Sequence, residues 1–346
     1  MKQTGIAIVG AGNIGALHAQ SIEVIPQAQV AVVCDVDEAR GRALAESCGA
    51  VWEEDLQQVL TRDDVQVVSV CTPSGSHAEI AVEAAQARKH LIVEKPIDVT
   101  LERADRIIHA AERAGVKITC ILPYRFMKGV QVVKEACERG RLGRLTLADV
   151  YVKWYRSQEY YDGNWRGTWA LDGGGALMNQ SIHNIDLLQW LAGPVDTIFG
   201  HAATLARRIE TEDTASAVLM FKSGALGVIQ GATSCWPGDR ARLELHGDQG
   251  TIALEEGCIV RWQLADASDE EEQRMLTLEE SLGSGSRDPT AISYEMHRRQ
   301  ITDMVAAIRE DREPAVMGGE ARKAIEIILG IYRSSQTGSL VRLPLN

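Results

Sequence analysis

The sequence lacks the features that define several broad protein classes. No stretch approaches the roughly eighteen consecutive apolar residues that a membrane-spanning helix requires, and the apolar segment 5–9 is too short for a secretory signal. The seven cysteines are odd in number and widely spaced, so we predict reduced thiols rather than a disulfide framework or a zinc site. No internal repeat is visible. We therefore expect a cytoplasmic protein that holds no metal.

Positive charge is also scarce. The 346 residues include 36 Lys and Arg against 48 Asp and Glu, which gives a formal net charge of −12. Such a charge repels phosphate backbones and anionic lipid surfaces, and this disfavours nucleic acids and membranes as partners. Hydrophobic residues make up 45% of the chain, as in ordinary globular proteins. The length favours two domains.

Residues 1–122 alternate short apolar runs with helical patterns. The runs are rich in Val and Ile, and they lie at 5–9, 29–34, 67–71, 90–93 and 117–122. Between them, Ala, Leu and Ile recur at helical spacing in segments 37–48, 76–88 and 100–114. Nearly continuous apolar strands separated by helices predict a doubly wound parallel sheet, covered on both faces, as the first domain.

After Pro123 the pattern changes, and residues 123–346 are predicted to form an α+β domain. Strand-like segments lie at 146–155, 213–221, 225–234, 240–246, 250–255 and 258–264, and helical patterns at 175–192, 292–311 and 319–333. Short connections predict an open, mainly antiparallel sheet with helices on one face. We interpret the acidic run 269–272 as a solvated loop. An uncovered apolar sheet face favours a homodimer or homotetramer formed through the sheet.

A glycine motif predicts a dinucleotide site in the first domain. Gly10-Ala11-Gly12-Asn13-Ile14-Gly15 follows the first strand and begins a helix, whose N-terminus would bind a pyrophosphate. Asp35 lies twenty residues beyond Gly15, at the end of the next strand, where a carboxylate binds the adenosine ribose. Its charge repels the 2′-phosphate of NADP, so the sequence favours NAD. Arg40 and Arg42 would partly offset that repulsion, but both fall in the next helical pattern.

Two further loops are predicted to flank the nicotinamide half of the cofactor. One is Thr72-Pro73-Ser74, with His77 shortly after it, and the other is Glu94-Lys95-Pro96. Both follow strands, and ligands of open α/β sheets bind beyond the carboxyl ends of the strands. Lys95 is therefore a candidate catalytic residue.

The second domain contributes its own polar residues. Asn179, His183 and Asp186 are spaced i, i+4, i+7 behind Gly173-Gly174-Gly175, which predicts one stripe on a helix that a ligand can approach closely. We therefore take Asn179 and His183 as candidates.

Seven of the fourteen Trp and Tyr residues crowd between positions 151 and 169. They are accompanied by Arg156 and Arg166. Flat aromatic faces suit a pyranose, and arginines suit hydroxyls or a carboxylate. An aromatic anchor for the sheet, or a subunit contact, explains the same pattern equally well.

Together, the glycine motif, Glu94-Lys95-Pro96 and the glycine-rich helix carrying His183 resemble the glucose–fructose oxidoreductase/inositol dehydrogenase (Gfo/Idh/MocA) family. The resemblance covers essentially the whole chain. It implies a Rossmann domain, a second domain with an open antiparallel sheet, and oxidation or reduction of sugars, inositols or related polyols. It makes Lys95 and His183 the catalytic pair. Asn179 falls where many members, including inositol dehydrogenases, have Asp. An Asn at this position resembles the branch that contains UDP-N-acetyl-glucosaminuronate 3-dehydrogenases.

The resemblance also extends the set of expected binding residues. Tyr124-Arg125-Phe126 lies where relatives often carry Asn-Arg-Phe, so Arg125 matches this motif and Tyr124 is unusual. The resemblance also implies that Trp165 and Arg166 lie near the nicotinamide and the substrate. The expected cofactor ligands are Gly10, Gly12, Asn13, Ile14, Gly15, Asp35, Thr72, Pro73, Ser74, His77, Glu94, Lys95, Pro96, Arg125, Trp165 and Arg166. The expected substrate ligands are Lys95, Arg125, Tyr155, Arg156, Trp165, Arg166, Asn179 and His183.

The sequence thus predicts an NAD-dependent dehydrogenase or reductase acting on a hydroxyl-bearing carbon of a sugar, a UDP-uronic sugar nucleotide or an inositol-like polyol. His183 is the natural base because its ordinary pKa lies near neutrality, and a cationic Lys95 would polarise the reacting oxygen. One alternative is a glycosidase that uses tightly bound NAD in a transient oxidation. Another is a non-catalytic NAD-sensing regulator, against which the presence of both Lys95 and His183 argues.

Overall fold

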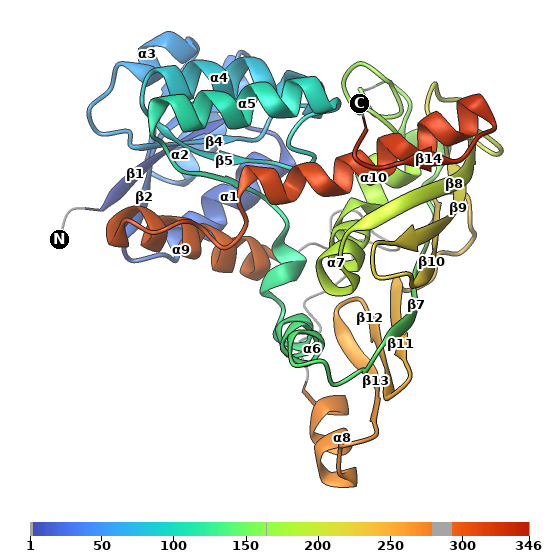
Figure 1. Ribbon diagram of the computed structural model, residues 1–346. Helices are drawn as coiled ribbons and strands as arrows, with labels where there is room; N and C mark the ends of the chain where they lie inside the picture. Colours follow the sequence, from blue (N-terminus) through green and yellow to red (C-terminus); the bar gives the residue numbers. More distant parts are fainter. Residues whose placement is uncertain (1–2, 164, 279–292, 346) are drawn as a thin grey trace. The chain divides into compact units, whose positions relative to one another are not determined.

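The computed structural model describes residues 3–163, 165–278 and 293–345 and divides the chain into two compact units (Figure 1). The first comprises residues 1–122 and 293–322, and the second comprises residues 123–292 and 323–346. A single boundary after residue 122 was predicted from the sequence, whereas residues 293–322 belong to the first unit. The reason is burial: Ile301, Met304 and Val305 of α9 (Tyr294–Glu310) pack into the same apolar core as β1 and α1.

The first unit is built on a six-stranded parallel sheet of order β3-β2-β1-β4-β5-β6. Its strands are β1 (Thr4–Val9), β2 (Ala28–Cys34), β3 (Val51–Glu53), β4 (Val67–Val70), β5 (His90–Val93) and β6 (Ile118–Cys120). Besides α9, its helices are α1 (Asn13–Glu23), α2 (Glu38–Ser47), α3 (Leu56–Leu60), α4 (His77–Gln86) and α5 (Leu101–Ala114). This confirms the doubly wound parallel sheet. The strand order reverses between β1 and β4, and ligands of such sheets bind at that point.

The second unit contains an eight-stranded sheet of order β13-β12-β11-β7-β10-β9-β8-β14. Its strands are β7 (Leu145–Lys153), β8 (Val195–Ala203), β9 (Thr214–Phe221), β10 (Leu226–Ala232), β11 (Arg242–Gly247), β12 (Gly250–Glu255), β13 (Cys258–Leu264) and β14 (Val341–Arg342). Only β10 and β7 pair in parallel, and the other neighbouring strands are antiparallel. The predicted open, mainly antiparallel sheet is confirmed.

The longer helices of the second unit are α6 (Lys128–Glu138), the π-helix η4 (Ala176–Ser181), α7 (Ile182–Ala192), α8 (Asp269–Leu276) and the larger part of α10 (Gly318–Thr337). The helical patterns predicted at 175–192 and 319–333 correspond to η4, α7 and α10, whereas α6 and α8 were missed. The solvated loop expected at 269–272 is wrong, because these residues form the first turn of α8. Ser268 caps that helix by accepting from the amide of Glu271, and acidic side chains favour a helix N-terminus.

The central strands of the second sheet have one buried and one exposed face. On β9, for example, Ala217, Leu219 and Phe221 are buried, whereas Val218 and Met220 are exposed. This alternation explains why the sequence pattern located these strands. No helix in the described part of the chain is long and apolar enough to cross a membrane.

Candidate cofactor and active-site residues

The glycine turn between β1 and α1 leaves open space at the N-terminus of the helix. Gly10 has a φ of +102°, and a Cβ on Gly15 would lie 2.0 Å from the carbonyl oxygen of Gly10. The protein's own packing therefore requires both glycines. A Cβ on Gly12 would meet no protein atom within 4 Å. Gly12 also begins α1 without a side-chain cap, so open space lies beside a helix N-terminus, where anions bind.

Asp35 lies one residue beyond β2 and is held rigidly. Its carboxylate accepts hydrogen bonds from the amides of Ala11 (2.6 Å) and Asp37 (2.8 Å). The Trp52 indole donates to its carbonyl oxygen. Asp35 therefore lies beside the glycine turn, since Ala11 is itself part of that turn, and its predicted contact with the ribose stays a prediction. The Arg40 guanidinium also pairs with this carboxylate.

The loops after β4 and β5 are braced against each other by His77. Its Nδ1 lies 2.9 Å from the carbonyl oxygen of Pro96, and its Nε2 lies 2.9 Å from that of Thr72. Because His77 is buried, this contact fixes the two loops. Its predicted contact with the cofactor stays a prediction.

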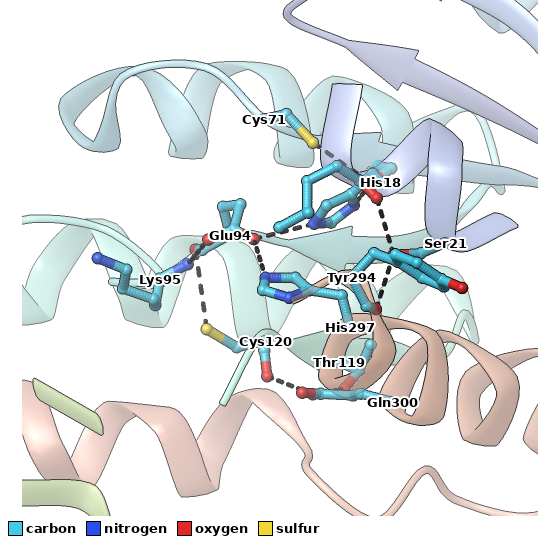
Figure 2. A network of polar contacts seen from close by, with 12 residues as sticks. His18, Ser21, Cys71, Glu94, Lys95, Thr119, Cys120, Tyr294, His297 and Gln300 are labelled. Carbon is cyan, nitrogen blue, oxygen red and sulfur yellow. Dashed lines mark hydrogen bonds and ion pairs between the residues drawn. The ribbon is translucent and has the colours of Figure 1, made fainter. Parts of the chain in front are cut away.

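Lys95 is the only residue between 91 and 99 that is not buried. Its backbone N–H donates to the Glu94 carboxylate, and its side chain points away from that carboxylate (Figure 2). The same carboxylate lies 2.9 Å from His18 Nε2 and 3.5 Å from His297 Nε2. The turn that presents Lys95 is therefore anchored to a buried polar cluster of Glu94, His18 and His297.

The charge state of this cluster follows from its hydrogen bonds. Burial lowers the pKa of His18, and the contact of its Nδ1 with Ser69 Oγ (2.8 Å) suits a neutral ring whose Nε2–H donates to Glu94. Burial alone would raise the pKa of Glu94, but the imidazole hydrogen bonds hold it well below its usual range. Glu94 is thus a buried carboxylate. The three side chains have metal-ligand chemistry within 4.8 Å of one another, and hydrogen bonding already accounts for their contacts.

The second unit presents Asn179 and His183 from a helix whose start is π-helical. Between residues 172 and 189 these two are the only residues that are not buried. The expected single stripe is wrong in two respects. Residues 176–181 form a π-helix, a feature frequent at functional sites, and Asp186 is buried in a bidentate pair with Arg125, at 2.6 and 2.7 Å.

Glu212 anchors the glycine-rich start of this helix, and sequence reasoning missed it. Its carboxylate accepts hydrogen bonds from the amides of Gly175 (3.0 Å) and Leu177 (2.8 Å) and from the Tyr332 hydroxyl (2.9 Å). A Cβ on Gly175 would lie 2.0 Å from the carbonyl oxygen of Glu212, so that glycine permits the close approach. Burial raises the pKa of Glu212 to about 7, although its hydrogen bonds lower it in part. No local motif signals such a long-range contact.

A chain of hydrogen bonds orients Asn179. Its amide nitrogen donates to Asp172, and its oxygen accepts from Gln180 at 2.9 Å. Gln180 in turn accepts from Arg156 at 2.8 Å. Arg156 is buried, so the structure gives it a supporting role beside Asn179, and its predicted contact with substrate stays a prediction.

Aromatic rings surround the same region of the second unit. The Tyr124 ring stacks on His183, with centroids 4.9 Å apart and an interplanar angle of 28°. Arg166 lies over the rings of Tyr160 and Trp165, and both Trp165 and Arg166 remain partly accessible.

The other aromatic residues of the 151–169 segment differ in their burial and in their contacts. Trp154 and Tyr161 are buried, as an anchor requires, whereas Tyr155 packs edge-on against the exposed Trp236. The segment is therefore partly a core element and partly an accessible surface.

Comparison with known proteins places both units in one family. Residues 4–121 match the family model described as oxidoreductase family, NAD-binding Rossmann fold, and residues 130–253 match the GFO/IDH/MocA C-terminal domain. The WlbA dehydrogenase from Bordetella pertussis, solved with NADH and UDP-GlcNAcA, is 32% identical with a TM-score of 0.89, and the match covers 100% of both chains. The corresponding Chromobacterium violaceum enzyme is 31% identical, also with a TM-score of 0.89, over 100% of this chain and 97% of that one.

A curated relative, myo-inositol 2-dehydrogenase from Thermotoga maritima, is 26% identical over 98% of each chain. These matches agree with the two-sheet architecture, a Rossmann-type parallel sheet in the first unit and a mainly antiparallel sheet in the second. The chain therefore belongs to the Gfo/Idh/MocA family and is an NAD-dependent oxidoreductase.

Proposed function

We propose that this oxidoreductase transfers hydride between NAD and a hydroxyl-bearing carbon of a sugar, a UDP-uronic sugar nucleotide or an inositol-like polyol, with Lys95 and His183 as its catalytic residues. The observation that carries the proposal is selective accessibility. In two long buried stretches, 91–99 and 172–189, the residues left accessible are Lys95 in the first and Asn179 and His183 in the second. Hydrogen bonds hold the backbone of Lys95 and the side-chain amide of Asn179. The ring of Tyr124 stacks on His183. Accessible polar side chains positioned in this way are suited to chemistry on a bound ligand.

The roles follow from what an alcohol oxidation demands. NAD, when bound, supplies the hydride acceptor. His183 takes the hydroxyl proton, because an imidazole is a base near neutral pH. Lys95, as a cation, stabilises negative charge on the same oxygen. Asn179 cannot accept a proton. It holds a substrate hydroxyl, and Asp172 and Gln180 fix its amide orientation.

The first unit is proposed to bind NAD and the second to bind substrate. In this proposal Gly10, Gly12 and the first turn of α1 hold the pyrophosphate, Asp35 holds the ribose, and the 72–74 and 94–96 loops flank the nicotinamide. Arg166 is the better candidate for a substrate carboxylate than Arg156, because Arg156 is buried and bonded to Gln180. The relatives named for UDP-GlcNAcA and inositol support this range of substrates.

The second unit is also proposed to form a homodimer or homotetramer through its sheet. Leu147, Phe199, Val218, Met220 and Leu226 are exposed on neighbouring strands. Strand pairing sets Phe199 opposite Val218, and Leu226 opposite both Met220 and Leu147. A contiguous apolar face of this kind favours a contact between copies.

A screen of substrate-dependent NADH formation tests the proposed activity. The panel comprises inositols, free sugars, glycosides and UDP-uronic sugars, and turnover is expected with at least one class. Release of a cleaved sugar during repeated turnover without added NAD would identify a glycosidase instead. Tight NAD binding with no turnover across the panel would contradict the proposal and favour a regulator.

A further inference from the structure

Arg40 occupies acceptor sites that the cofactor itself needs. An ionised carboxylate offers about four lone-pair sites. Four donors already reach Asp35: the amides of Ala11 and Asp37, and the Nε (3.2 Å) and Nη2 (2.8 Å) atoms of Arg40. Each carboxylate oxygen has two of them. Ribose hydroxyls cannot donate to Asp35 until one of these donors leaves.

Among these donors, Arg40 is the one free to move. The Ala11 amide belongs to the glycine turn, and the Asp37 amide belongs to the residue that caps α2. Neither moves without breaking the backbone around the site. The Arg40 side chain is 51% exposed, and exposed ion pairs contribute little to stability.

The surroundings keep a displaced Arg40 close to the ribose position. Gly41 lets α2 lie against Trp52 and Asp35, because a Cβ there would meet the Trp52 ring at 2.4 Å and the Asp35 Cβ at 3.3 Å. The helix that carries Arg40 is therefore fixed. On the same helix, Arg42 pairs with Glu38 and lies over the Trp52 ring, so Arg40 is the cation directed at Asp35.

We propose that Arg40 reduces the selectivity for NAD over NADP: it competes with the ribose of NAD for Asp35 and, once displaced, it binds the 2′-phosphate of NADP. The proposal rests on the assignment of the ribose to Asp35. It predicts that the affinity for NAD exceeds the affinity for NADP by a smaller factor with Arg40 than without it. Asp35 and Asp37 carry two negative charges beside one arginine, so NAD remains the preferred cofactor, and Arg40 leaves a measurable affinity for NADP.

The test measures the dissociation constants of NAD and NADP on the full chain, without substrate and in phosphate-free buffer, for the unmodified protein, Arg40→Ala and Arg40→Met. Removing the competitor should lower the NAD constant about two- to fivefold, the value of an exposed ion pair. Losing a charge-assisted contact should raise the NADP constant at least about tenfold. A ratio of the two constants within twofold of the unmodified protein, or weaker NAD binding, would overturn the proposal.

Arg42→Ala is the matched control, because it removes the same charge from the same helix and leaves Asp35 paired. Its ratio should stay within twofold of the unmodified protein. A ratio that changes as much as in Arg40→Ala would make the effect one of general charge and overturn the proposal.

The Asp35→Ala variant separates the competition of Arg40 with NAD from its direct binding of NADP. In Asp35→Ala the competition is gone, so adding Arg40→Ala should leave NAD affinity unchanged and still weaken NADP. An equal gain in NAD affinity in both backgrounds would contradict competition. These titrations contain no sugar, so they do not depend on catalytic activity. Normal NAD binding with an unaltered ratio of the two dissociation constants refutes only the role of Arg40. A failed substrate screen refutes only the proposed function.

Discussion

In each unit a buried glutamate anchors the segment that carries a candidate catalytic residue, and the two glutamates differ in charge. Glu94, behind Lys95, accepts from imidazoles, and its pKa lies well below the usual range although burial acts in the opposite direction. Glu212, at the start of the helix that carries His183, accepts from two amides and a tyrosine, and burial raises its pKa to about 7. Burial opposes ionisation in both, so the partners decide the outcome.

This difference indicates how each candidate site is built. The first unit places a fixed negative charge next to the backbone of Lys95, while the Lys95 side chain extends elsewhere. In the second unit, neutral donors tie Glu212 to the helix start, and its charge changes in the physiological range. The two units should therefore respond in opposite ways to pH.

The largest expected effect is on turnover. Lys95→Ala and His183→Ala should each lower kcat at least about a hundredfold, because each removes a group that holds or stabilises a transferred proton or charge. NAD affinity, measured by titration on the same samples, should stay within a few fold. Most of the activity surviving in His183→Ala would show that the base is another residue and would single out Lys95.

The second effect is on stability in the second unit. Between about pH 4.5 and pH 7 the folded state holds a proton on Glu212 that the unfolded chain releases, so this group's stabilising contribution falls as pH rises through that window. The shift from 4.5 to about 7 corresponds to about 3 kcal/mol. Urea unfolding at several pH values should show that Glu212→Gln loses this slope. An identical slope in the variant and the unmodified chain would be evidence against the assignment.

The first unit should show the opposite trend. Burial keeps His18 neutral when the unfolded chain takes up a proton below about pH 6.5, and Glu94 stays ionised when the unfolded chain protonates below about pH 4.5. Stability from both groups is therefore lost on acidification. His18→Gln should flatten the part of the curve just below pH 6.5, as measured by the same unfolding series. A curve that kept its slope there would contradict a neutral His18.

The smallest effect on fold stability is expected at the exposed sheet face. Val218→Lys places a charge at a side chain that is 55% exposed. The free energy of unfolding of the single chain should therefore change by less than about 0.5 kcal/mol. If copies associate through this face, sedimentation should show a lower mass for the variant. Lys222→Ala, in the turn that follows β9, is a control that should keep the mass. Equal masses for Val218→Lys and the unmodified protein would exclude this face as the contact.

Predictions from the sequence were most reliable for features that depend on residues close together in the chain. Gly10, Gly12 and Gly15 lie within one turn, and Asp35 follows the next strand, so spacing alone was enough to predict a cofactor site from these residues. The runs 5–9 on β1 and 29–34 on β2 were visible because nearly all of their residues are apolar. By contrast, β3 has only three residues, two of them Trp and Glu, and it offered no apolar run to detect.

Contacts between distant segments could not be predicted from the sequence. Glu212 reaches Gly175 and Leu177 across more than thirty positions, and His297 joins Glu94 from a helix assigned to the other domain. Asp186 lay at the right spacing to accompany His183, but spacing did not reveal its buried bidentate pair with the distant Arg125. The acidic run at 269–272 looked like a loop because charge alone does not distinguish a solvated loop from the N-terminal turn of a helix.

Isotope transfer tests the central claim most directly. A substrate found in the screen, deuterated at the carbon that bears the reacting hydroxyl, is incubated with the protein and NAD, and the NADH formed is examined by mass spectrometry. Direct hydride transfer predicts NADH that carries the deuterium, with slower turnover than the unlabelled substrate gives. NADH without deuterium, formed at an unchanged rate, would contradict the account.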